Sequence, residues 1–229
     1  RDLDGWTGAI EVSQARIDAA EAQLSDDLKL DIQYAHQNIR AFALAQRASA
    51  QEFEVELRPG LFAGQRHIPL QTAGCYVPGG RYSHVASAIM TVTTAKVAGV
   101  ENVITCSAPH AEHNGIHPAI LYTMNLCGAD HILALGGVQG IAAMAFGLFT
   151  GSRANILVGP GNRFVAEAKR ILFGRVGIDL FAGPTEILVI ADETHYRMRI
   201  LVGIVKAEEP VADILAKLMA ESEAALKRR

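Results

Sequence analysis

Three glycine-rich turns, each following a short apolar stretch, carry the polar side chains in this sequence that are best suited to ligand binding. The turns read YVPGGRYS, ALGGVQG and VGPGNR, and they contain Tyr76, Gln139 and Asn162 respectively. Glycine lets a backbone approach a ligand closely, and the amides that open a following helix can hold phosphate. A nucleotide or phosphate ligand is therefore favoured. Ordinary turn and core roles stay open, because asparagine suits turns and tyrosine is often buried.

The usual dinucleotide-binding fingerprint is absent. No GxGxxG stretch is followed at the right distance by an acidic residue. The nucleotide hypothesis therefore depends on the three turns taken together.

A fourth loop, in the segment IDLFAGPTE, offers a hydroxyl at Thr185 and a carboxylate at Glu186. Pro184 restricts the backbone there. The segment indicates either a polar contribution to a site or a plain β-turn between two strands.

A histidine-rich segment, HAEHNGIH, has the spacing of a metal site. His110, His113 and His117 are separated by two and three residues. Gly115 and Pro118 interrupt any helix that would align the three rings. A loop that precedes a helix is the favoured interpretation.

Composition excludes several classes of protein. The net charge of −3 gives no reason to expect nucleic acid. Three cysteines, Cys75, Cys106 and Cys127, are odd in number and form no CxxC pair, so we expect buried, reduced thiols in a cytoplasmic protein. RDLDGWTGAIEV lacks the apolar stretch of a signal peptide. The apolar residues 132–149 contain glycines and Gln139, which favours a strand, a turn and a buried helix over a membrane span.

The elements that must position these turns alternate along the chain. Residues 7–49 are predicted to form two helices, the second opening at Ser25, and EFEVEL a half-buried strand. From Tyr76 onward, helices over about 84–98, 118–127, 138–146 and 162–172 alternate with apolar strands in NVITC, HILAL, ANILVGP, GIDLF and EILVIAD. The apolar stripes are predicted as Ile10, Ile17 and Leu24 on the first helix and Leu28, Ile32, Ile39 and Phe42 on the second.

This alternation predicts an α/β fold. We expect an N-terminal helical arm and an incomplete, Rossmann-like, mostly parallel sheet with helices on both faces.

The motifs, taken as a set, resemble the histidinol dehydrogenase family. GCYVPGGRYSHVASAIM, TTAKVAGV, LGGVQGIAAMAFG, VGPGNRFVAEAKR and IDLFAGPTEILVIAD occur in the family's order and at similar spacing, from about Arg58 to Asp192. The resemblance implies NAD-dependent, zinc-containing homodimers that oxidise a primary alcohol through an aldehyde to a carboxylate. It assigns NAD contacts to Tyr76, Gln139 and Asn162, and a substrate contact to Thr185.

The resemblance also implies a division of the chain. Residues 1–75 would supply N-terminal helices and short strands, and 76–180 the NAD-binding domain. Residues 181–229 would supply returning strands and a C-terminal helix.

One stretch, RYSHVASAIM, departs from histidinol-specific sequences. It looks more like the branch that acts on sulfonated diols such as dihydroxypropanesulfonate. Arg81 or His84 would then meet an acidic group of the substrate.

A larger departure follows ILVIAD, where the family has a QAEHG segment with zinc ligands and later a Glu-His acid–base pair. Here the sequence continues ETHYRMRILVGIVKAEEP, so no metal ligand or catalytic residue is assigned. We expect a truncated or divergent member. Two hypotheses follow: an NAD-dependent alcohol dehydrogenase acting on histidinol or a sulfonated diol, and a non-catalytic remnant that binds NAD or a partner chain.

Overall fold

The computed structural model describes residues 6–79 and 83–180. Its helices are α1 (Gln14–Glu21), α2 (Asp26–Ser49), α3 (Val85–Ala88), the π-helical η1 (Ile89–Thr93), α4 (Thr94–Val97), the 3₁₀ turn η2 (Ala111–His113), α5 (Pro118–Leu126), α6 (Gly137–Phe146) and α7 (Arg163–Leu172). Its strands are β1 (Phe53–Arg58), β2 (Leu61–Gln65), β3 (Thr72–Tyr76), β4 (Asn102–Ser107), β5 (His131–Ala134), β6 (Ile156–Val158) and β7 (Gly177–Ile178).

Five strands form one parallel sheet in the order β5-β4-β3-β6-β7. The predicted α/β architecture with a mostly parallel sheet is therefore confirmed. The strand predicted in EILVIAD lies outside the described residues.

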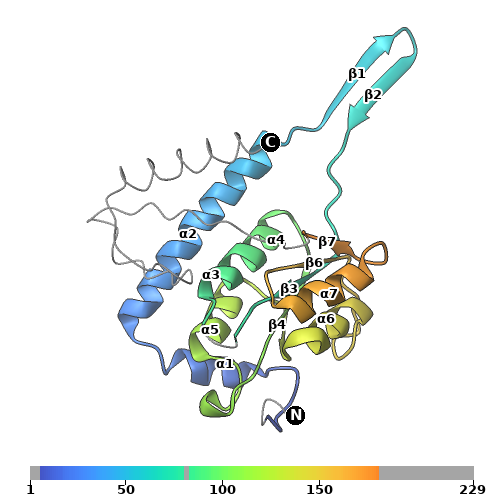
Figure 1. Ribbon diagram of the computed structural model, residues 1–229. Helices are drawn as coiled ribbons and strands as arrows, with labels where there is room; N and C mark the ends of the chain where they lie inside the picture. The colour runs from blue at the N-terminus through green and yellow to red at the C-terminus, as the bar shows by residue number, and fades with distance from the viewer. Residues whose placement is uncertain (1–5, 80–82, 181–229) are drawn as a thin grey trace, which may run out of the picture. The chain divides into compact units, whose positions relative to one another are not determined.

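Helices cover both faces of this sheet, also as predicted (Figure 1). Successive strand residues point to opposite faces, so neighbours in sequence join different cores. Ala73 and Cys75 pack with residues of α2, η1 and α5, whereas Tyr76 and Ile104 pack with residues of α6 and α7. Strands buried on both faces need nearly continuous apolar sequence, which explains stretches such as NVITC.

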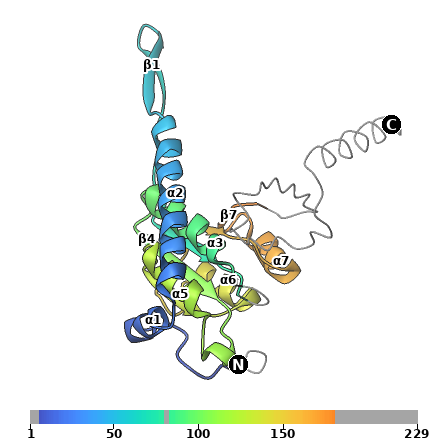
Figure 2. The same ribbon diagram turned by 90° about the vertical axis from the view of Figure 1, so that its left-hand side faces the viewer.

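The long helix α2 begins where its sequence predicts. The Ser25 side chain accepts a hydrogen bond from the Leu28 amide, and Asp26 and Asp27 lie in the first turn. The helix then runs without a break towards the β1–β2 hairpin (Figure 2). Its predicted apolar face is only partly right, because Ile32 is buried but Phe42 is exposed. Ile39 is partly buried and Leu28 is exposed.

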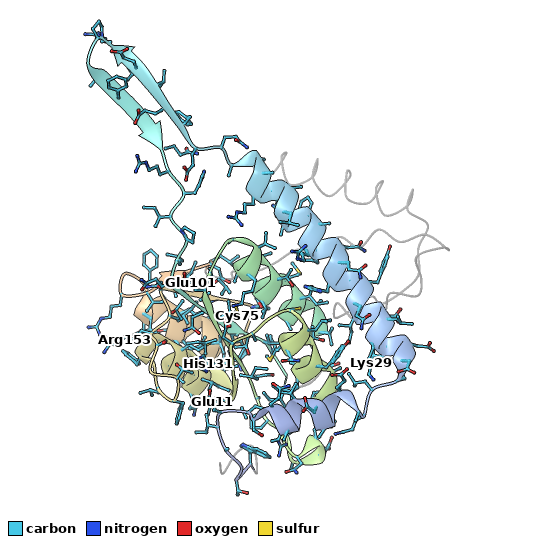
Figure 3. The ribbon with its side chains drawn as sticks, turned by 180° about the vertical axis from the view of Figure 1, so that it is seen from behind. Glu11, Lys29, Cys75, Glu101, His131 and Arg153 are labelled. Atoms are coloured by element: carbon cyan, nitrogen blue, oxygen red, sulfur yellow. The ribbon has the colours of Figure 1, made fainter. Side chains whose placement is uncertain are left out.

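The first predicted helix starts later than expected, and its stripe of Ile10, Ile17 and Leu24 is wrong as a helical face. The residues around Glu11 pair antiparallel with β5: the Val12 amide donates to the Ile132 carbonyl (2.9 Å) and the Ala134 amide to the Ile10 carbonyl (2.7 Å). Figure 3 shows Glu11 beside His131, and Glu11 Oε1 lies 2.8 Å from His131 Nδ1. Because β5 is an edge strand, its unpaired backbone groups favour this pairing over a longer helix.

The segment EFEVEL forms the predicted strand, but the expected half-burial is wrong. All residues of β1 and β2 are exposed. Among the residues that the structure describes, the two strands pair only with each other, around the turn at Pro59 and Gly60. An amphipathic pattern buries one face only if another layer covers it, and no described residue covers this hairpin.

The helix predicted over 84–98 is present, but its middle part is a π-helix rather than an α-helix. It consists of α3, η1 and α4 in succession. The Thr91 hydroxyl donates to the Ser87 carbonyl (2.7 Å) and the Thr94 hydroxyl to the Met90 carbonyl (2.5 Å). Hydroxyls bonded four residues back compete with the backbone ladder and bend helices, which is consistent with a π turn here.

Residues 132–149 contribute β5, a turn and α6, as predicted. Among residues 6–79 and 83–180, no helix has the length and apolar character required to cross a membrane.

All three cysteines are free and buried, as predicted. Burial raises the pKa of Cys75 to about 12 and that of Cys127 to about 11, and it raises the pKa of Cys106 as well. The thiolate is the reactive form, so raised pKa values protect these thiols.

We therefore expect a disulfide-exchange reagent at pH 8 to label native protein very slowly and to label three thiols after unfolding. The reagent releases a coloured thiolate when it reacts, and the absorbance of that thiolate, with and without denaturant, measures the labelling. Rapid labelling of folded protein would contradict the burial.

Candidate functional site

The strand order reverses its direction of winding at β3 and β6, so their carboxyl ends are where the fold class places its ligand crevice. The chain moves outward from β3 through β4 to β5, then returns to the other side of β3 for β6 and β7. Open α/β sheets bind ligands where the direction of winding reverses in this way. The turns that leave β3 and β6 border this point.

Tyr76, the last residue of β3, connects three turns. Its ring is buried in the core, and its hydroxyl oxygen accepts a hydrogen bond from the Gly137 amide (3.0 Å) at the start of α6. A Cβ built on Gly159, at the end of β6, would overlap the Tyr76 carbonyl oxygen. Gly159 has φ +111°, so both its conformation and its surroundings require glycine. Tyr76 thus has both a core role and a place at the crevice.

Gln139 lies exposed in the first turn of α6. The residue before this helix, Gly136, has no side chain to cap it. No group of the described residues accepts from the amides of Val138 and Gln139. The start of α6 therefore offers backbone donors and a side-chain amide to an anionic or polar ligand.

Asn162 caps α7. Its Oδ1 accepts from the amides of Phe164 (3.0 Å) and Val165 (3.1 Å). Asn162 therefore has the structural role in the turn that its residue type favours. Because the cap occupies Oδ1, a ligand would have to form its hydrogen bond with Nδ2. The side chain is exposed, so Nδ2 is accessible.

A partly buried ion pair lies behind the turn after β6. Lys169 Nζ is 2.5 Å from Asp179 Oδ1, and the lysine is only 4% exposed. Sequence reasoning missed both residues. The available signal was that Lys169 shares the spacing of Val165 and Leu172, the apolar stripe of α7.

A groove of about 1080 Å³ opens beside this turn. It is bordered by Gly159, Pro160 and Asp179 and extends past η1 to the end of α2, at Arg47. Its size is that of pockets that hold small ligands, but Tyr76, Gln139 and Asn162 are not among the residues that line it.

The histidine segment forms no metal site in the described part of the chain. The rings of His113 and His117 are 4.6 Å apart, and those of His110 and His113 are 6.5 Å apart. His117 Nδ1 accepts from the Ala119 amide, so it caps α5. Burial, followed by the charges of His113 and His110, lowers the pKa of His117. Residues 6–79 and 83–180 contain no group of three His, Cys, Asp or Glu side chains placed to hold a metal ion.

Comparison with known proteins identifies the family. The family model described as histidinol dehydrogenase matches residues 1–228. The chain belongs to the histidinol dehydrogenase family.

Relatives within the family carry several names. A histidinol dehydrogenase homolog of Ruegeria pomeroyi is 64% identical over 192 residues, and the sulfopropanediol 3-dehydrogenase of the same organism is 58% identical over 192. Each match covers 84% of this chain and 44% of the relative. The histidinol dehydrogenase of Methanosarcina mazei is 40% identical over 213 residues, which are 93% of this chain and 49% of that protein. The chain therefore spans less than half the length of these relatives.

A solved family member has the same fold over this region. The crystal structure of histidinol dehydrogenase from Elizabethkingia anophelis matches with a TM-score of 0.76 and 39% identity, covering 84% of this chain and 44% of that one.

The structure describes only one of the four residues that the sequence suggests for substrate binding. Thr185, Glu186 and Arg81 lie outside the described residues. His84 is exposed immediately before α3, with no side-chain capping bond.

Proposed function

We propose that this chain supplies the NAD-binding domain of a histidinol dehydrogenase-family enzyme that oxidises a primary alcohol through an aldehyde to a carboxylate. The observation that carries the proposal is the convergence at Tyr76 of the turns after β3, β5 and β6. Two of these turns also present Gln139 and Asn162, the family's other NAD positions.

The residues at this edge suit a dinucleotide. The open amides of α6 and the Gln139 side chain would bind phosphate or ribose oxygens, and Asn162 Nδ2 would donate a further hydrogen bond. NAD, when bound, supplies the hydride acceptor. Alcohol oxidation also needs a base for the hydroxyl proton and a group that stabilises the alkoxide. The described residues supply no zinc site, so no step is assigned to a metal here.

Gln139→Ala and Asn162→Ser should each weaken NAD binding about tenfold, because each removes roughly one hydrogen bond. Serine keeps an oxygen that can cap α7, so Asn162→Ser tests the amide rather than the cap. Isothermal calorimetry measures the dissociation constants.

Gln37→Ala, on the exposed face of α2, is the matched control and should bind NAD like the unmodified chain. Unchanged affinity in both site variants would refute the assignment.

The substrate is proposed to be a sulfonated diol rather than histidinol. The segment RYSHVASAIM supports this, as does the 58% identity with the sulfopropanediol 3-dehydrogenase. Tighter binding of histidinol than of dihydroxypropanesulfonate to the NAD-loaded chain would count against it.

We also propose a cytoplasmic homodimer. A two-stranded hairpin is marginally stable alone in water, and β1 and β2 are exposed throughout. Packing against a second copy would cover them. Light scattering after gel filtration gives the mass, and a monomer would refute this part of the proposal.

The alternative is a non-catalytic member that binds NAD or a partner chain. The sequence after ILVIAD, which lacks the family's QAEHG segment, favours it. NAD binding with no measurable NADH formation, even after zinc is added in excess, would identify it, whereas slow but measurable NADH formation would favour the enzyme.

A further inference from the structure

Lys169 and Asp179 hold both backbone polar groups of a single glycine. Lys169 Nζ donates to the Gly159 carbonyl (2.8 Å), and the Gly159 amide donates to Asp179 Oδ2 (2.8 Å). The other carboxylate oxygen, Oδ1, receives Lys169 Nζ and the Leu180 amide (2.8 Å). We call Gly159, Lys169 and Asp179 the turn clamp.

The turn clamp resists separation because its lysine is buried. The side chain of Lys169 is 5% exposed and that of Asp179 is 24% exposed. A buried charge that loses its partner is strongly unfavourable. The two side chains therefore hold each other in place, and through their bonds they hold the Gly159 peptide.

The held peptide lies between two of the proposed NAD contacts. Gly159 abuts the carbonyl oxygen of Tyr76, and it begins the turn that reaches Asn162 three residues later. Any rotation of the Gly159 peptide would shift the turn relative to the end of β3. The groove reaches this turn at Gly159 and Pro160, where Asp179 also borders it.

We propose that Lys169 and Asp179 are positioning residues of the cofactor site, which set the path of the turn that carries Asn162. The inference rests on the proposed NAD-binding function. It assigns a binding role to an ion pair that touches no cofactor itself.

The molecule contains a matched control at the opposite edge of the sheet. Lys96 Nζ donates to the Glu101 carbonyl (2.9 Å) and lies 2.5 Å from Asp130 Oδ2, which also accepts from the Val103 amide (2.7 Å). This pair holds the amino ends of β4 and β5, away from the crevice.

The test compares Lys169→Met/Asp179→Asn with Lys96→Met/Asp130→Asn. Double variants remove both charges, so neither leaves an unpaired one. We expect the first to bind NAD about tenfold more weakly, because a displaced contact loses its geometry. We expect faster hydrogen exchange at residues 159–165 in the same variant without ligand. The control pair should change neither quantity. Circular dichroism verifies folding, and Lys169→Gln/Asp179→Asn replaces the first variant if it does not fold.

Each result decides a separate claim. If the unmodified chain does not bind NAD, the proposed function fails, and the exchange data still decide whether the turn clamp orders the turn. Unchanged exchange at 159–165 overturns the inference. So does an unchanged dissociation constant in a folded variant when the unmodified chain binds NAD.

Discussion

Gly159→Ala should lower the free energy of unfolding by more than any other single glycine-to-alanine change at the crevice. An L residue at positive φ costs about 1–2 kcal/mol, and Gly159 has φ +111°. The new methyl group would also overlap the Tyr76 carbonyl oxygen in a closely packed region. The sum is expected to exceed about 3 kcal/mol, which is a large part of the stability of an ordinary domain. Urea denaturation followed by circular dichroism measures it.

Gly151→Ala separates the two contributions. Gly151 also has positive φ, at +71°, but nothing lies within 4 Å of a Cβ built there. The Gly151→Ala variant should therefore lose only the part of the free energy of unfolding that comes from backbone conformation, about 1–2 kcal/mol. Equal losses in the two variants would show that β3 and β6 do not approach each other as closely as described.

The second large effect concerns turnover. The 229-residue chain is expected to bind substoichiometric zinc and to form NADH from histidinol or dihydroxypropanesulfonate at least about a hundredfold more slowly than a full-length relative. A catalytic zinc needs about three protein ligands and an open position. The resemblance places the family's ligands after ILVIAD, where this sequence has ETHYRMRILVGIVKAEEP. His195, the histidine of that stretch, and Glu193 lie outside the described residues.

The sulfopropanediol 3-dehydrogenase of Ruegeria pomeroyi, assayed in parallel, is the suitable reference. Elemental analysis gives the zinc content and absorbance gives NADH. His113→Ala/His117→Ala tests adventitious metal binding, because that pair of rings lies close together. Stoichiometric zinc with rapid NADH formation would show that the residues after ILVIAD carry the metal site in another form.

Much of the candidate site was predictable from local sequence. The turns at Tyr76, Gln139 and Asn162 were recognised because each joins an apolar strand to a helical pattern, and the helix starts at Ser25 and Asn162 have capping residues. Such signals involve residues that are close in sequence. The choice between turn and ligand roles for Asn162 was not predictable, because it depends on which atoms the cap occupies.

The sequence by itself determined the α/β class, the positions of the glycine turns and the family. Only the tertiary structure decided the strand order, and with it the meeting of Tyr76, Gly137 and Gly159. It also decided that the segment around Glu11 covers the edge of β5, and that Lys169 pairs with Asp179 inside the domain. The physical reason is the range of the interactions. Periodicity and capping act over a few residues, whereas strand order and buried charge pairing depend on packing between segments distant in the chain.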